Sequence, residues 1–67
     1  MPKQLMNGVR DCREKKGMTQ EEVAKKAGVS RQTIVAIEKG NYVPSVALAM
    51  ELAKVLECSV EGLFHWK

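Results

Sequence analysis

Apolar residues recur at helical spacing in two short blocks near the middle of the chain. The blocks are Val23, Ala24 and Ala27, then Ile34 and Ile37. Spacings of three and four residues put side chains on one face of a helix, so each block predicts a short amphipathic helix. Gly28 falls where the first helix must end and the chain must reverse, a position that often needs a positive φ. The pattern therefore predicts two helices joined by a tight turn within residues 20–39, with Val29 of the turn pointing inward.

Capping residues mark the start of both helices. Thr19 precedes Glu22 by three residues, the spacing of a capping box, and Ser30 precedes Thr33, a weaker partner, by the same interval. The small side chains of the first helix let the two helix axes approach closely. A helix-turn-helix of this kind places its second helix in the major groove of DNA.

Three further helices are expected around this pair. The first begins after Asn7 as N-cap, runs to Lys16 and stops at Gly17, with Val9 and Cys12 facing the core. A fourth, from Val46 to Leu56, follows the Ser45 cap and is apolar nearly all round, so we expect it to be buried on several sides, with one edge left for a partner subunit. A last short helix, Val60 to Leu63, follows Ser59.

The two ends of the chain alternate weakly between apolar and polar residues. Residues 3–6 could pair with residues 64–67 in a small β ribbon, although unpaired termini fit so short a pattern equally well. The predicted fold is all-α, a single domain of five helices spanning residues 1–67, with or without this ribbon.

Length and charge narrow the functional class. A chain of 67 residues buries only about 60% of the surface of its unfolded form, so dimerisation would add needed stability. Residues 1–39 carry nine Lys or Arg against five acids, whereas residues 40–67 carry two against three. The positive half contains the helix pair, as a nucleic-acid-binding surface would, although a solvated lysine-rich surface gives the same count. No apolar run is long enough to span a membrane and no leader is evident, so we expect a cytoplasmic protein.

Metal, cofactor and catalytic chemistry have little support. Cys12, Cys58 and His65 are scattered, whereas structural zinc usually takes four ligands in closely spaced pairs, so we interpret the cysteines as reduced core thiols. We expect no metal, no cofactor and no small-molecule ligand. A single histidine and the lack of a glycine-rich phosphate loop leave no catalytic constellation, so the protein is not expected to be an enzyme.

The segment GMTQEEVAKKAGVSRQTIVAIEKGNYVPS resembles the Cro and lambdoid-repressor family of helix-turn-helix regulators. Arg13, the TQEE box, Gly28-Val29-Ser30, Ile37-Glu38 and Pro44-Ser45 occur in the family's order and spacing. The ending LFHWK is similar to the smallest bacterial members, which lack a sensor domain and form homodimers. Glu57 departs from the family, since glycine or asparagine is common where the fourth helix ends.

The resemblance implies roles that side-chain chemistry can support. Base-reading residues on the second helix of the pair would be Arg31, Gln32, Val35 and Ala36. Arginine suits guanine and glutamine suits adenine, and an apolar pair suits a thymine methyl. Arg31 could equally contact a backbone phosphate, and Val35 could instead pack on a neighbouring side chain.

Further residues would contact the sugar-phosphate backbone: Gln20, Ser30, Thr33, Lys39, Asn41 and Tyr42. Gln20 lies at a helix N-terminus, which favours a phosphate, but it could also be only an exposed polar residue after a cap. The family implies a structural ion pair between Arg13 and Glu38. A dimer interface would involve Leu52, Val55, Leu63, Phe64 and Trp66.

The resulting hypothesis is a homodimeric, sequence-specific regulator of transcription, most simply a repressor, that binds an inverted-repeat operator in double-stranded DNA. The alternative is an antitoxin or other protein-interaction module that retains a helix-turn-helix.

Overall fold

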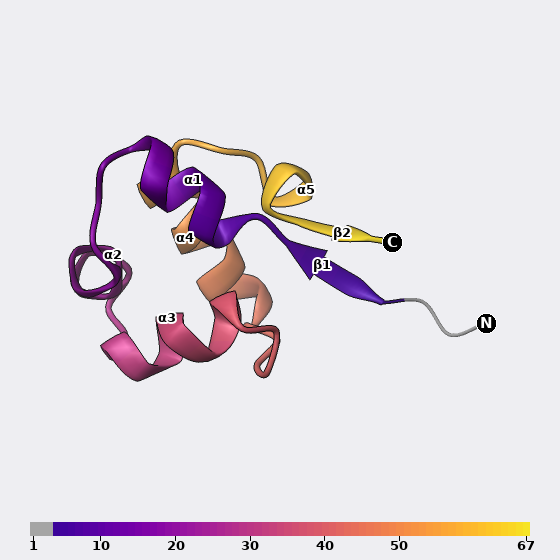
Figure 1. Ribbon diagram of the computed structural model, residues 1–67, viewed down its shortest axis with the longest axis horizontal. Coiled ribbons are helices and arrows are strands. Elements are labelled where there is room, and N and C mark those ends of the chain that lie inside the picture. The colour runs from indigo at the N-terminus through magenta and orange to yellow at the C-terminus, as the bar shows by residue number, and fades with distance from the viewer. Residues whose placement is uncertain (1–3) are drawn as a thin grey trace.

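The computed structural model describes residues 4–67, which form five helices and two short strands (Figure 1). They follow one another as β1 (Leu5–Asn7), α1 (Val9–Lys15), α2 (Gln20–Ala27), α3 (Arg31–Glu38), α4 (Val46–Leu56), α5 (Val60–Leu63) and β2 (Phe64–Trp66). In Figure 1, α1 lies along the upper edge and α3 along the lower edge, with the strands extending to the right. The predicted five-helix fold is confirmed, and the β ribbon is present.

The core gathers one side of every helix around α4. Its most buried members, each at most 8% exposed, are Val9, Val23, Ala24, Ile34, Ile37, Leu52, Ala53, Leu56 and Leu63. The apolar positions predicted for α2 and α3 are therefore core positions, except Ala27, which is partly buried. Burying one large aliphatic side chain contributes about 1.5–3 kcal/mol, so this cluster fixes how α3 sits on the domain.

Both helices of the pair, α2 and α3, start with the predicted caps. Thr19 Oγ1 accepts a hydrogen bond from the Glu22 backbone N–H at 3.0 Å, and Glu22 Oε1 accepts one from the Thr19 N–H at 2.8 Å. Gly28 ends α2 with a φ of 77°, in the left-handed region. Ser30 Oγ accepts from the Thr33 N–H at 3.3 Å and starts α3. The direction of α3 is therefore set by local sequence as well as by the core.

The start of α1 differs from the prediction. Asn7 is the last residue of β1, and Gly8 is the N-cap of α1. Asn7 Oδ1 still accepts from the Val9 N–H at 3.3 Å, while its amide donates to the Ile37 carbonyl at 3.0 Å. The prediction of Asn7 as N-cap is wrong because the residue joins the strand and uses its side chain to connect the start of α1 to α3.

The ribbon pairs β1 and β2 antiparallel, with Leu5 opposite Trp66, Met6 opposite His65 and Asn7 opposite Phe64. Beyond its ends, the Gly8 N–H donates to the Leu63 carbonyl at 2.7 Å and the Lys67 N–H donates to the Gln4 carbonyl at 2.9 Å. Lys3, which the sequence pattern included in the ribbon, lies outside the described residues.

α4 is less enclosed than its composition predicts. Val46 is 78% exposed and Met50 is 61% exposed, because the core contacts of α4 lie on the opposite side of the helix. Leu52 and Leu63, predicted to lie in a dimer interface, are fully buried in the protomer. Because these side chains have no accessible surface in the protomer, the interface proposed below is built from other residues.

Glu57 keeps the left-handed cap at the end of α4 despite its side chain, with a φ of 57°. It is the only described residue other than glycine with a positive φ. Its carboxylate lies 2.8 Å from Lys16 Nζ, so the cap also connects the ends of α1 and α4.

Candidate nucleic-acid interface

One face of α3 packs in the core, and the remaining residues of the helix are accessible to a ligand. Ile34 and Ile37 are fully buried. Arg31 and Gln32, in the first turn, are exposed, and Val35 and Ala36 are half-buried. The four residues predicted to read bases therefore all keep some accessible surface, most of it at the start of the helix. The half-burial of Val35 and Ala36 is compatible with both interpretations given above for Val35.

Of the six residues predicted to contact a DNA backbone, all but Gln20 lie near the two ends of α3. At its start, the Ser30 and Thr33 hydroxyls lie 3.1 Å apart and are engaged with each other in the cap. At its end, Lys39 and Asn41 are exposed, and Tyr42 is 47% exposed. The chain turns through Gly40, with a φ of 80°, and the Asn41 N–H donates to the Ala36 carbonyl at 2.9 Å.

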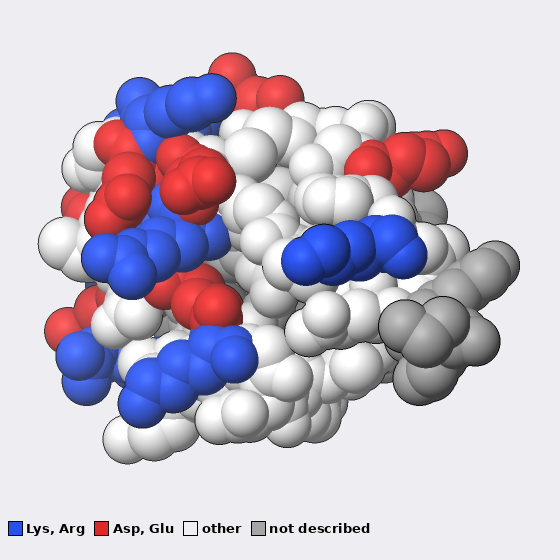
Figure 2. All heavy atoms as spheres, turned by 45° about the vertical axis from the view of Figure 1, so that its right-hand side comes forward, with Lys and Arg blue, Asp and Glu red and all other residues white. Residues whose placement is uncertain are grey.

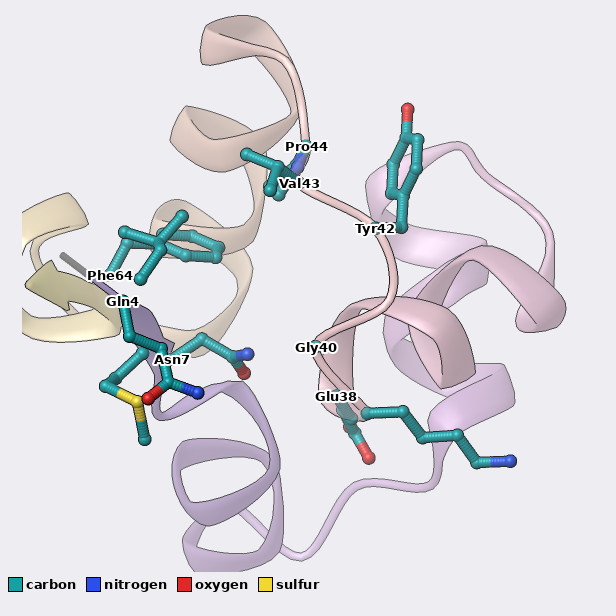
Figure 3. A pocket seen from close by; sticks show the side chains of 11 residues that line it. Gln4, Asn7, Glu38, Gly40, Tyr42, Val43, Pro44 and Phe64 are labelled. Carbon is teal, nitrogen blue, oxygen red and sulfur yellow. The ribbon is translucent and has the colours of Figure 1, made fainter. Parts of the chain in front are cut away.

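A hollow of about 490 Å³ separates this turn from the β ribbon (Figure 3). In Figure 3, Asn7 and Phe64 lie on one side of it and Gly40 on the other, while Tyr42 points away from Asn7 and Phe64. The tyrosine ring is therefore directed away from the ribbon. Sequence reasoning missed this hollow, because the residues around it come from both ends of the chain and from the middle.

Arg13 and Glu38 form an ion pair between α1 and α3. Arg13 Nε lies 2.7 Å from Glu38 Oε2 and Arg13 Nη2 lies 3.2 Å from Oε1, a bidentate arrangement. The side chains are only 13% and 5% exposed. Hydrogen bonding to the carboxylate raises the pKa of Arg13, and Arg13 Nη1 also donates to the Met18 carbonyl at 2.9 Å. The pair thus connects α3 to α1 and to the segment that leads into α2.

Gln20 joins this network, a contact that the sequence did not suggest. Its Nε2 donates to Glu38 Oε1 at 3.0 Å, so Glu38 accepts from both Arg13 and Gln20. The bond holds the Gln20 amide at the N-terminus of α2, beside α3. Its donor and acceptor are 18 residues apart, and no local spacing rule covers a contact of that range.

A smaller hollow of about 290 Å³ lies beside this network. Three cationic side chains and one carboxylate line it, together with Gln20 and Val35; the charged residues are Arg10, Arg13, Lys39 and Glu38. Because Glu38 is already bonded to Arg13, the remaining charge at the rim is positive. Arg10 was missed by the sequence analysis, and it forms an exposed ion pair with Glu14 at 3.3 Å.

Charge is unevenly distributed over the surface. Figure 2 shows Lys and Arg alternating with Asp and Glu along one side of the molecule, while uncharged side chains cover most of the rest of that face. An apolar groove of about 580 Å³ is lined by Leu5, Val43, Pro44, Val46, Ala49, Met50, Val60, Glu61 and Phe64. We call it the α4 groove; it combines a charge-poor lining with highly exposed apolar residues of α4.

Within residues 4–67, no three His, Cys, Asp or Glu residues gather as a metal site would require. No helix among these residues is long and apolar enough to cross a membrane.

Comparison with known proteins identifies the family. The helix-turn-helix family HTH_3 matches residues 9–63. A protein of Archaeoglobus fulgidus named an uncharacterized HTH-type transcriptional regulator is 55% identical over 56 residues, which cover 84% of this chain and 80% of the relative. Among solved structures, the restriction-modification controller protein C.AhdI of Aeromonas hydrophila is similar, with a TM-score of 0.78 and 30% identity over 84% of this chain and 85% of its own.

The DNA-binding domain of SinR from Bacillus subtilis is also similar, with a TM-score of 0.73 and 31% identity over 79% of this chain and 78% of its own. The matched region contains the ion pair, both helices of the pair and the exposed residues of α3. The chain therefore belongs to the Cro/C1-type helix-turn-helix family, whose members include DNA-binding regulators of transcription.

Proposed function

We propose that this protein is a transcriptional repressor that binds a specific sequence in double-stranded DNA through α3. The observation that carries the proposal is the division of α3 into a buried face, with Ile34 and Ile37, and an exposed first turn with Arg31 and Gln32. Because the buried face is fixed by the core, the exposed turn has a defined orientation, which base reading requires. A repressor of this kind acts in the cytoplasm, where bacterial and archaeal DNA is accessible.

Two sets of contacts have different tasks in this proposal. Arg31 and Gln32 donate hydrogen bonds to purine edges in the major groove, and Val35 and Ala36 contact thymine methyl groups. The backbone set lies around them: Gln20, Ser30, Thr33, Lys39, Asn41 and Tyr42. Gln20 contacts a phosphate with the second hydrogen of its amide while Glu38 accepts the first, so the Arg13–Glu38 pair orients a DNA contact as well as α3. A domain bound in this way covers the DNA beneath it, so repression by occupying a promoter is the simplest mechanism.

DNA selected from a random pool by the wild-type protein provides the test. Fluorescence anisotropy would compare the selected sequence with a scrambled duplex of equal length at two salt concentrations. Gln32→Ala should weaken binding to the selected duplex by about 5- to 150-fold and leave the scrambled duplex nearly unaffected. Lys39→Ala is the matched control, and it should weaken both duplexes by a similar factor and lower the salt dependence.

An equal loss on both duplexes for Gln32→Ala would move Gln32 to the backbone set. Wild-type affinity that does not change with salt would remove phosphate contact, and with it the proposed mode of binding.

We also propose that the repressor is a homodimer formed through the α4 groove. Val46 and Met50 expose large apolar surfaces there, and Phe64 borders the same groove. Contiguous apolar surface of this kind marks an interaction site. Of the five predicted interface residues, Phe64 and Trp66 keep accessible surface at this end of the molecule, and Val55 is half-buried.

The strand β2 supports the same interface. In an antiparallel ribbon, hydrogen-bonded residue pairs alternate with pairs that are not hydrogen-bonded to each other. The Gly8–Leu63 and Gln4–Lys67 pairs are bonded, so the pair of Leu5 and Trp66 is not, and the N–H and C=O groups of Trp66 point to the outer edge. Such an edge can pair with the same strand of a second copy. Two copies related by a twofold axis would direct their α3 helices at major grooves about 34 Å apart, which requires an inverted-repeat operator.

Sedimentation velocity tests the interface. Met50→Lys puts a charge in the groove and should convert a dimer to a monomer, whereas Glu51→Lys, on the next residue of α4 and outside the groove lining, should remain dimeric. Dissociation by both variants, or by neither, would reject the groove as the dimer interface. A monomeric wild-type protein at micromolar concentration would reject the dimer itself.

A further inference from the structure

Two cysteines that are far apart in the sequence meet on the side of the domain away from α3. Cys12 lies on α1, and Cys58 lies in the connection between α4 and α5. Their sulfur atoms are 3.0 Å apart although the residues are 46 positions apart in the chain. Both are free thiols and both are half-buried, so a small reagent can reach them. This contact has no part in the proposed DNA interface.

The geometry points to a redox function, and we propose that Cys12 and Cys58 form a reversible intramolecular disulfide when the protein meets a peroxide. A disulfide holds its sulfur atoms about 2.05 Å apart, so they must approach by only about 1 Å. Cys58 sits in a short connection just after the end of α4, where a shift of this size does not disturb a helix interior. The bond ties α1 to the segment between α4 and α5.

The local contacts favour the protonated form of Cys12. Hydrogen bonding with Cys58 and burial raise the pKa of Cys12, so its thiol keeps its proton at neutral pH. Cys58 Sγ contacts Cys12 Sγ at 3.0 Å and the Leu56 carbonyl at 3.4 Å. Either sulfur can attack the oxidant first, and both orders give the same disulfide.

The reaction balances with a peroxide as the two-electron oxidant. When Cys58 reacts first, its thiol gives up a proton and its sulfur attacks one peroxide oxygen, the O–O bond breaks, and the departing hydroxide takes that proton to leave as water. Cys58 is then a sulfenic acid. Cys12 sulfur attacks the Cys58 sulfur, the S–O bond breaks, and the released hydroxide accepts the Cys12 proton and leaves as a second water. Two thiols and one peroxide therefore yield one disulfide and two waters, and a dithiol reductant reverses the change.

The position of the pair determines what the disulfide does. In Figure 1, α3 lies along the lower edge, whereas the connection between α4 and α5 passes beside α1 along the upper edge. The cross-link therefore leaves the exposed face of α3 unchanged. It closes a long loop of chain, which removes conformations from the unfolded state and makes the domain more resistant to unfolding.

The intact 67-residue chain can be tested directly. The reduced wild-type chain would be treated with hydrogen peroxide at neutral pH and examined by intact-mass measurement, free-thiol titration and thermal unfolding. We expect a monomer-sized chain that has lost two hydrogen atoms, no free thiol, and a thermal midpoint about 10 °C or more above that of the reduced protein. Dithiothreitol should restore the original midpoint.

Cys12→Ser and Cys58→Ser are the matched controls, and neither should gain stability on oxidation. The wild-type measurement does not depend on either variant folding. Disulfide-linked dimers, oxidation of the two sulfurs to separate sulfinic acids, or an oxidised wild-type chain with an unchanged midpoint would each overturn the proposal.

Discussion

At the scale of single residues, Glu38 carries more contacts than its place at the end of a helix suggests. Arg13 and Gln20 both donate to its carboxylate, and these two residues come from different helices. A buried ion pair is not strong evidence for stability, since its desolvation cost can equal its attraction. Its effect here is to fix one arrangement: α1, the start of α2 and the end of α3 must come together for all three groups to be satisfied.

Replacing Arg13 alone should therefore be costly. Arg13→Met leaves the Glu38 carboxylate, only 5% exposed, without its cation, and the expected loss in the free energy of unfolding is about 3 kcal/mol. Arg10→Met is the control, because its pair with Glu14 is exposed and worth at most about 1 kcal/mol. Urea unfolding of both variants measures the difference. If both variants lose a similarly small free energy of unfolding, the buried ion pair contributes no more to stability than the exposed one.

Glu57 offers a second test at this scale, since a left-handed backbone costs a residue with a Cβ about 1–2 kcal/mol. Glu57→Gly and Glu57→Ala both remove the ion pair with Lys16, so comparing them isolates the backbone effect. The glycine variant should be more stable than the alanine variant by about 1 kcal/mol by urea unfolding. Equal stability of the two would mean that the chain adopts another cap without cost.

At the scale of elements, α2 and α3 are held by different means. α2 has a complete capping box at its start and a left-handed glycine at its end, so interactions between residues close in the sequence set both of its ends. α3 has only the Ser30 cap, and its end is held by the Asn41 and Gly40 backbone bonds and by the Asn7 amide on the Ile37 carbonyl. The end of the helix proposed to read DNA is thus held by local backbone bonds and by one distant residue, Asn7.

The capping box predicts how stability responds to acid. Hydrogen bonds from the Thr19 backbone and side chain lower the pKa of Glu22 below its ordinary value of 4.5. A lowered folded-state pKa means that the stabilisation is complete above the unfolded value and is lost as pH falls through the folded value. The thermal midpoint of Glu22→Gln should therefore fall less than that of the wild type between pH 6 and pH 3.

Glu21→Gln removes a neighbouring exposed carboxylate and is the control for the general effect of charge. If Glu21→Gln and Glu22→Gln respond to acid alike, the capping box is not the cause.

At the scale of the whole molecule, the domain has two distinct surfaces. One carries the exposed first turn of α3 and, toward the end of that helix, the hollow lined by Arg10, Arg13 and Lys39; the other carries the α4 groove. A chain of 67 residues has a small core, so covering the groove would add stability as well as pair two DNA-binding surfaces.

Dimerisation through the groove makes stability depend on concentration. The thermal midpoint of the wild type should rise over a hundredfold increase in protein concentration, because association stabilises the folded state by mass action. Met50→Lys should show no such rise, and Glu51→Lys should behave as the wild type. A wild-type midpoint independent of concentration would contradict a dimer that unfolds as it dissociates.

The sequence by itself determined the helices and the turn between α2 and α3. Apolar spacing, the Thr19, Ser30, Ser45 and Ser59 caps and the glycine at position 28 are local signals, and each acts within a few residues of where it is read. The family resemblance added the Arg13–Glu38 pair and the residues proposed to contact DNA.

Only the tertiary structure decided which apolar residues of α4 are buried. Leu52 and Val46 lie on the same helix and look alike in the sequence, yet one is fully buried and the other is 78% exposed. The sequence likewise does not predict the hydrogen bonds of Asn7 to α3, Gln20 to Glu38 and Cys12 to Cys58. Each joins residues at least 18 positions apart, and the packing of the whole chain brings such residues together, whereas periodicity and caps report only on near neighbours.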